Sequence, residues 1–181
     1  VVRNRPDVKL VIPTGFSERS MELLRQSGHR GEVVEMPPGA HALFPGGATV
    51  TFDIPIFLKT HGEQVLYVNL EGKGIVTITG CCHPGVLALL QYARDHFEGF
   101  EGFHGVYGGL HISPFEEWGP PQDELLDKLQ EFGVRKFACN HCTGVTAIRK
   151  MRERGMPVAG GTGRYGSRSD LYPGNGDSVE F

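Results

Sequence analysis

The sequence predicts a mixed α/β (α+β) fold, and two features carry this prediction. From about residue 74 onward, short β-branched segments alternate with segments in which apolar residues recur at helical spacing. This alternation is typical of strand–helix–strand units. Glycine and proline, with 26 and 12 copies, separate the segments as they do in turns. The 181 residues suit a single domain, 1–181, with a sizeable core.

The first part of the chain predicts short strands around one helix. Strands are expected at residues 9–12, 32–36 and 48–54, where β-branched residues lie between proline and glycine. Ser17 is a suitable N-cap for a helix that ends at Gly28. Segments 64–69 and 74–79 predict a hairpin across the glycine-containing turn between them.

The second part alternates helices with strands. Helices are expected over residues 84–97, 121–132 and 144–154, and strands over 105–107, 134–139 and 178–181. Pro84 and Pro121 suit the first turn of a helix, and Thr143 can cap the third helix.

Composition narrows the function classes. The chain is 39% hydrophobic and 22% charged, with 18 Lys and Arg against 21 Asp and Glu, giving a net charge of −3. The positive charges are scattered, which indicates neither nucleic acid nor an anionic membrane as a partner. No apolar run approaches the roughly 20 residues of a membrane span. The first residues lack both Met and a signal-peptide h-region, so we expect further residues upstream. As the partner we expect a small-molecule substrate.

Three histidines occupy one recurring position, where a predicted strand ends and the chain turns. They are His83 in GCCHPG, His111 in GGLH and His141 in CNHCTG. Imidazole is the commonest protein ligand for transition metals, and functional groups of α/β proteins gather at the carboxyl ends of strands. Three converging strand ends would therefore form a metal site.

The four cysteines all flank these histidines. Cys81 and Cys82 precede His83, whereas Cys139 and Cys142 enclose His141. A secreted disulfide framework would spread its cysteines, so the clustering indicates reduced thiols near a metal in the cytoplasm. A thiol beside the helix that follows Pro84 should be more readily deprotonated.

Other interpretations stay open for each motif. The turn around His83 is equally consistent with a tight connection whose small residues let a helix pack. Cys139 and Cys142 form a CxxC pair, as in thioredoxin-like redox proteins. The four cysteines together are a third possibility, a structural zinc site, although adjacent Cys81 and Cys82 lack the usual spacing.

In combination, the three motifs resemble those of a known family. GIVTITGCCHPG at 74–85, GGLH at 108–111 and HCTG at 141–144 occur in order and at suitable distances. Together they resemble the metallo-β-lactamase-fold hydrolases, specifically the branch that includes dihydropterin ribofuranosyl-aminobenzene phosphate synthase-like proteins. The resemblance covers residues 60–181.

The resemblance implies a four-layer αββα sandwich with one or two divalent metal ions, often zinc, at one edge of the sheets. It also implies hydrolysis of esters, amides or phosphodiesters by a metal-bound hydroxide. His83, His141 and His111 are the implied metal ligands. Cys81 stands where many members of the superfamily carry a metal-bridging aspartate, so it could ligate a softer metal.

One departure from the family is a missing motif. The family's His-x-His-x-Asp-His belongs to the N-terminal half, and this chain contains no His-x-His. We therefore expect the C-terminal part of such a hydrolase, with weak metal binding and slow hydrolysis. We also expect an upstream segment, a second chain or a homo-oligomer to cover the sheet. The rival hypotheses are a non-catalytic metal-binding module of the same fold and a thiol redox protein.

Overall fold

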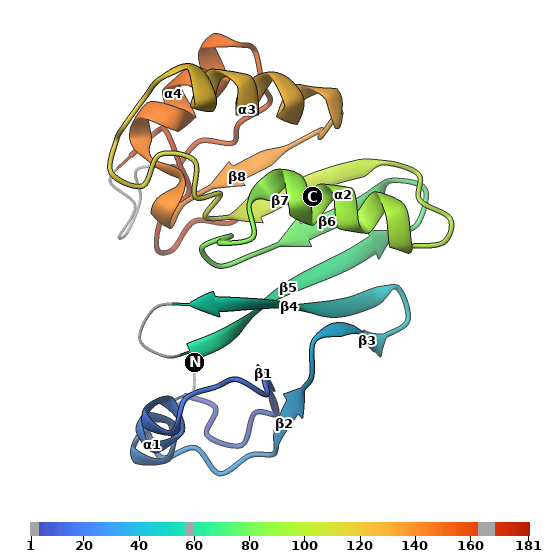
Figure 1. The fold of residues 1–181 in the computed structure, drawn as a ribbon, viewed down its shortest axis with the longest axis vertical. Helices are drawn as coiled ribbons and strands as arrows, with labels where there is room; N and C mark the ends of the chain where they lie inside the picture. The colour runs from blue at the N-terminus through green and yellow to red at the C-terminus, as the bar shows by residue number, and fades with distance from the viewer. Residues whose placement is uncertain (1–3, 57–59, 163–168) are drawn as a thin grey trace.

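The computed structural model describes residues 4–56, 60–162 and 169–181, apart from the side chains of Thr60 and His141. The described elements are β1 (Leu10–Pro13), α1 (Glu18–Gln26), β2 (Val33–Met36), β3 (Gly39–Phe44), β4 (Gly47–Ile56), β5 (Thr60–Leu70), β6 (Gly74–Ile78), α2 (Val86–His96), β7 (Phe103–Gly108), α3 (Pro120–Glu131), β8 (Phe137–Cys139), the 3₁₀ turn η2 (His141–Thr143) and α4 (Val145–Glu153). Figure 1 shows the N-terminal unit at one end of the molecule and helices α3 and α4 at the other.

The N-terminal unit consists of β1, α1 and β2. The two strands pair in parallel, with Leu10 opposite Val33, and α1 connects them. Ser17 caps α1, and its hydroxyl accepts a hydrogen bond from the N–H of Ser20 at 3.2 Å. The N-cap predicted from the sequence is therefore confirmed.

The main sheet has six strands in the order β3-β4-β5-β6-β7-β8. Strands β3 to β6 are antiparallel neighbours, which confirms the predicted β5–β6 hairpin. Strands β6, β7 and β8 are parallel, and α2 and α3 provide the two crossovers between them. Parallel strands end at the same edge of a sheet, so the segments that carry His83, His111 and His141 leave from one edge.

The core lies between the sheet and helices α2, α3 and α4. It joins sheet residues such as Val65, Tyr67 and Val106 to helix residues such as Leu90 and Leu126, all of them buried. In Figure 1, α2 lies across the strands β6 and β7, and α3 and α4 lie near β8. Helical spacing of apolar residues predicted these helices because each needs one continuous face against the sheet.

The opposite face of the sheet is covered only in part. Leu43, which is 39% exposed, lines a shallow hollow on this face together with Val11, Leu66 and Ile78. Near β7 the C-terminal residues provide the cover, because the ring of Phe181 occupies the space where a side chain at Gly105 would lie.

Three sequence predictions of local structure differ from the structure. Strand β3 was not expected, and it forms the edge of the sheet. Residues 178–181 form no strand; the Lys136 ammonium holds the Glu180 carbonyl at 2.5 Å, and Phe181 packs on the sheet. Thr143 does not cap α4, whose N-cap is Gly144. On the sheet, Val76, Val106 and Phe137 are buried within the chain, whereas Ile78 is only partly buried. The expectation that a further segment or chain covers the sheet stays a prediction.

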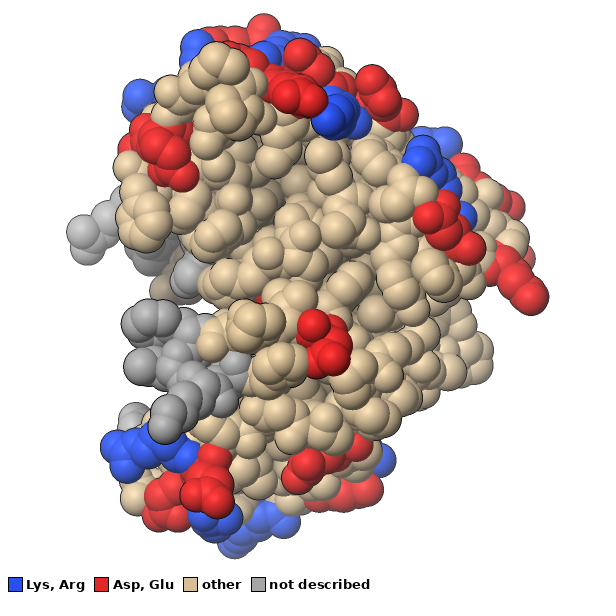
Figure 2. All heavy atoms as spheres, in the orientation of Figure 1, with Lys and Arg blue, Asp and Glu red and all other residues tan. Residues whose placement is uncertain are grey.

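Charges of both signs are mixed over the two ends of the molecule, and the middle of the face in Figure 2 is mostly uncharged. No basic patch is visible on that face. Within the described ranges, no helix has the length and hydrophobicity that a membrane crossing requires.

Candidate metal centre

The candidate centre is at the edge where β6, β7 and β8 end. Two consecutive glycines bring these strand ends unusually close. A Cβ at Gly108 would lie 2.1 Å from the Thr79 carbonyl oxygen, and one at Gly109 would lie 2.7 Å from the Gly80 carbonyl oxygen and 2.9 Å from the Cys142 sulfur. The backbone therefore passes very close to the neighbouring strand ends here, and only glycine fits.

His83 and His111 lie side by side at this edge. Their ring centres are 5.0 Å apart, with the rings tilted by 50°. With zinc–nitrogen bonds of about 2.0–2.1 Å and tetrahedral angles, two imidazole rings on one ion have centres about 5 Å apart. The two imidazoles are thus spaced as they would be on a shared metal ion.

Glu63 on β5 holds His83 in place. Its carboxylate accepts the backbone N–H groups of Cys82 at 2.7 Å and His83 at 2.9 Å, and it contacts His83 Nδ1 at 2.7 Å. An ionised carboxylate cannot donate, so Nδ1 donates to it, and in the neutral imidazole Nε2 is then the nitrogen with the lone pair. A carboxylate behind a histidine is the usual arrangement around metal ligands, because it fixes the ring and its tautomer.

The sequence analysis missed Glu63, although the sequence contains a signal for it. Glu63 has the same strand parity as Val65 and Tyr67, which face the helices, so a charged residue stands in a buried register. The Glu63 side chain is only 9% exposed. Buried carboxylates are rare unless they are paired, so this position indicates a specific task.

The third predicted histidine cannot be placed in the site. The backbone of His141 begins the 3₁₀ turn η2 beyond β8, but its side chain lies outside the described residues. In the part of the chain that the structure describes, no three His, Cys, Asp or Glu side chains are grouped as a metal site. The described donors therefore supply two imidazoles, and the metal-ligand role of all four predicted residues, Cys81 included, stays a prediction.

The cysteines divide into a contacting pair and two buried thiols. The Cys142 thiol donates to the Cys81 carbonyl oxygen at 3.1 Å, and the two side chains also interact with each other. Cys82 and Cys139 are buried. All four residues are thiols in the structure.

The prediction of an easily deprotonated thiol before α2 is wrong. Burial raises the pKa of Cys81 to about 11, with further contributions from Cys142 and Glu63. Burial likewise raises the pKa of Cys82 to about 12 and that of Cys139 to about 12. At these positions, the free-energy cost of removing a thiolate from water exceeds the stabilisation that the helix N-terminus gives to a negative charge.

Backbone strain gathers at this edge. Among the described residues, positive φ outside glycine occurs at Cys82 (66°), His111 (47°) and Glu116 (62°). Such conformations persist only where the surroundings enforce them, and they cluster at functional sites. All three residues follow the ends of β6 and β7.

The loop after His111 is fastened to the start of α4. Glu116 accepts the N–H groups of Val145 at 2.8 Å and Thr146 at 2.7 Å, and these bonds lower the pKa of its carboxyl group. Thr143 does not cap α4 but joins the same two segments: its hydroxyl accepts a hydrogen bond from the Leu110 N–H at 3.0 Å and donates one to the Asn140 carbonyl at 2.9 Å. The rim of the site is therefore held by hydrogen bonds on both sides.

Comparison with known proteins identifies the fold. No protein-family model matches the sequence. A solved structure described as Tm1679, a metal-dependent hydrolase of the beta-lactamase superfamily, superposes with a TM-score of 0.61 at 18% identity, covering 74% of this chain and 57% of that one. The chain has a metallo-β-lactamase-type fold. Within the described residues, the six-stranded sheet and the four α-helices match that fold class, as the sequence predicted.

A curated relative supports the predicted branch of the superfamily. The 7,8-dihydropterin-6-methyl-4-(beta-D-ribofuranosyl)-aminobenzene-5'-phosphate synthase of Methanocaldococcus jannaschii is 28% identical over 98 residues. The match covers 54% of this chain and 32% of the synthase, so this metallo-β-lactamase-fold chain spans about a third of the curated relative that it matches. The resemblance to the synthase-like branch is confirmed.

Proposed function

We propose that this metallo-β-lactamase-fold chain carries part of a divalent-metal site, zinc or a similar ion, that serves water-dependent hydrolysis. The observation that carries the proposal is the pair of imidazoles 5.0 Å apart, with the Glu63 carboxylate 2.7 Å behind one of them. Nitrogen donors oriented by a carboxylate suit zinc. His83 and His111 would hold the ion, with His141 as the third ligand and Cys81 as a thiol donor.

When bound, such an ion would act as a Lewis acid and lower the pKa of a bound water molecule to near 7. The protein residues hold the metal-binding side chains and the surrounding loops in position. Glu63 holds the His83 ring through Nδ1 and leaves Nε2 outside this contact, and the hydrogen bonds of Glu116 and Thr143 fix the loops on either side. The curated relative is named a synthase, so the proposal of hydrolysis rests on the chemistry of the donor side chains and not on that name.

Metal binding is tested first, without reference to activity. Isothermal titration of the metal-stripped chain with zinc should give one binding event, and cobalt(II) should give visible absorption bands typical of low coordination. His83→Ala and His111→Ala should each lower zinc affinity about tenfold or more. His41→Ala is the control, because this imidazole belongs to β3, where it contacts the Pro37 carbonyl, away from this edge. Equal zinc affinity in all three variants would contradict the proposal.

Hydrolysis is tested separately with bis(4-nitrophenyl) phosphate and 4-nitrophenyl esters. We expect slow turnover that requires zinc and is lost in His83→Ala. A non-catalytic metal-binding module is the second candidate, favoured because two imidazoles, rather than a full ligand set, converge among the described side chains. Zinc binding with no turnover would support that module.

A redox function is less well supported. In the CxxC pair, Cys139 is 1% exposed and its pKa is raised to about 12, so a thiolate at this position would be scarce and out of reach. We propose a reducing compartment such as the cytoplasm, because the four cysteines cluster in two short motifs instead of being spread along the chain as in a secreted disulfide framework. We also retain the proposal that a second chain, an upstream segment or a homo-oligomer covers the open part of the sheet.

A further inference from the structure

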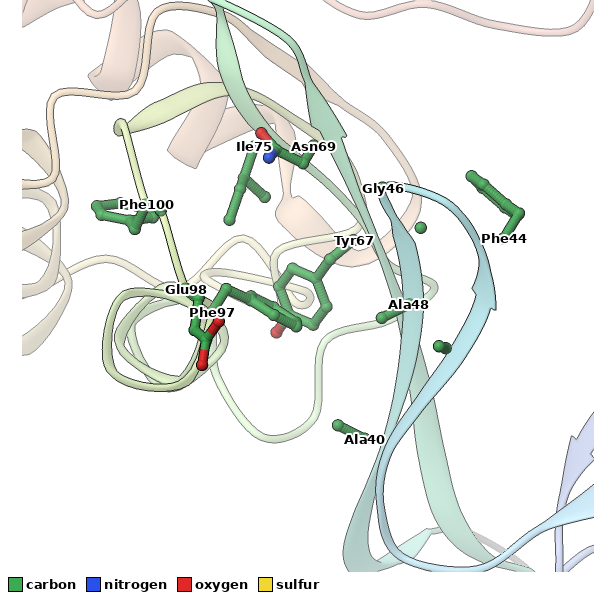
Figure 3. Close-up of a pocket in the computed structure, with 13 residues that line it drawn as sticks. Ala40, Phe44, Gly46, Ala48, Tyr67, Asn69, Ile75, Phe97, Glu98 and Phe100 are labelled. Atoms are coloured by element: carbon green, nitrogen blue, oxygen red, sulfur yellow. The ribbon is translucent and has the colours of Figure 1, made fainter.

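A second hollow lies at the opposite end of the sheet from His83 and His111. It lies where β5 ends and β6 begins, whereas the imidazoles follow the carboxyl end of β6. Its volume is about 400 Å³. Figure 3 shows it between the segment that follows α2 and the β3–β4 hairpin.

One side of this hollow is built from residues too small to fill it. The hairpin contributes Ala40, Ala42, Gly46 and Ala48. Helix α2 ends at His96, and the hairpin continues the sheet beyond the helix end. Because neither a large side chain nor a helix covers these alanines, the apolar face of the sheet continues here as an open groove.

The other side is aromatic and rigid. Tyr67 and Phe97 have ring centres 5.1 Å apart, and the Tyr67 hydroxyl donates to the Leu89 carbonyl at 3.0 Å. Phe100 packs edge-on against Phe103 with ring centres 4.8 Å apart. These contacts hold the wall before any ligand arrives, so a ligand would lose little free energy in ordering the protein.

The groove differs in charge from an ordinary apolar hollow. Among the described residues that line the groove, Glu98 alone carries a formal charge, and none is Lys, Arg or His. Asn69 adds an amide on the strand side, and its oxygen can accept a hydrogen bond. Figure 3 shows the Phe44 ring on the outer side of the hairpin, away from the hollow. The groove therefore offers apolar walls with an acidic margin.

We propose that this groove is a second ligand-binding site, which takes a two-ring aromatic amine. An apolar cavity of about 150 Å³ holds one benzene ring, so the volume of about 400 Å³ suits a body of two fused rings. The rings lie between the aromatic wall and the alanines, and the ammonium group lies at Glu98. Complementary charge selects the amine over a carboxylate of the same shape.

The test uses three naphthalene probes that differ only in charge: 2-naphthylmethylamine, 2-naphthalenemethanol and 2-naphthoate. Calorimetry or ligand-observed NMR with the 181-residue chain should rank them amine, alcohol, carboxylate. The amine should bind about tenfold more tightly than the carboxylate, because attraction and repulsion at one exposed carboxylate each contribute a few-fold. Glu98→Gln should reduce this ratio to about unity and leave the alcohol unchanged.

Two variants fill the groove, Ala42→Leu and Ala48→Leu. Ala42 is exposed, so its variant should fold even if Ala48→Leu does not. Each should weaken all three probes about tenfold, whereas Ala88→Leu on the exposed face of α2 should have no effect. Equal binding by wild type and Ala42→Leu, or no preference for the amine, would overturn the proposal. Concentration-dependent self-association that Ala42→Leu abolishes would also overturn it, since a second copy would then occupy the groove.

Discussion

Glu63→Ala tests most directly whether a buried carboxylate organises the candidate metal centre. The substitution removes the acceptor of three hydrogen bonds of 2.7 to 2.9 Å from a side chain that is 9% exposed. Two backbone N–H groups, of Cys82 and His83, then lose their partner. Leaving a buried donor unsatisfied costs roughly 1–3 kcal/mol, so we expect the free energy of unfolding to fall by about 3 kcal/mol.

Urea denaturation followed by circular dichroism measures this loss. With a slope of about 2 kcal/mol per molar urea, the midpoint should fall by about 1.5 M. Zinc affinity, titrated without urea on the folded variant, should fall 10- to 100-fold because His83 loses its orienting partner. Glu63→Gln keeps one oxygen acceptor, so its urea midpoint should lie between those of wild type and Glu63→Ala. This variant also keeps the test usable if Glu63→Ala does not fold.

Asp53→Ala is the matched control. Asp53 contacts His61 Nδ1 at 2.8 Å, nearly the length of the Glu63–His83 contact, but the two side chains are 62% and 50% exposed. Exposed ion pairs contribute about 0–1 kcal/mol, so this variant should denature close to wild type. If Glu63→Ala and Asp53→Ala had the same urea midpoint and the same zinc affinity, the argument from burial and orientation would be refuted.

Three further predictions follow from other parts of the structure. Gly109→Ala should destabilise the chain by about 1–3 kcal/mol, because its Cβ would lie 2.9 Å from the Cys142 sulfur. Gly80→Ala is the control and should leave the stability unchanged, because its Cβ would meet no atom within 4 Å. Equal melting temperatures of the two variants would contradict this prediction. The pKa of the Cys139 thiol rises from 9.0 in the unfolded chain to about 12 in the folded chain. The free energy of unfolding should therefore fall above pH 9 by up to about 1.4 kcal/mol per pH unit. Cys139→Ala should reduce this slope, measured by urea denaturation at several pH values. The open sheet face at Leu43 predicts self-association in sedimentation equilibrium, weakened by Leu43→Glu; a monomer of 19.8 kDa throughout the micromolar range would refute it.

Local features of this chain could be predicted from the sequence because their causes are local. The Ser17 cap depends on the Ser20 N–H three residues away, and helices α2, α3 and α4 follow from apolar residues at helical spacing. The hairpin of β5 and β6 follows from the turn between them. The three-part motif likewise indicated the metallo-β-lactamase-type fold, because each part is a strand end whose residues are adjacent in the sequence.

Other features depend on tertiary structure. The Glu63 carboxylate meets His83 across 20 positions of sequence, and the Cys142 thiol meets Cys81 across 61; strand register brings each pair together, and no local pattern encodes that register. The raised pKa of the cysteines was mispredicted because burial of a thiol depends on the packing of distant segments. Residues 178–181 have a strand-like composition but do not pair with a strand of the described sheet. The Phe181 ring instead fills the space beside Gly105. The sequence alone determines which segments become helices and most of those that become strands, and their assembly decides which side chains are buried, oriented and close enough to act together.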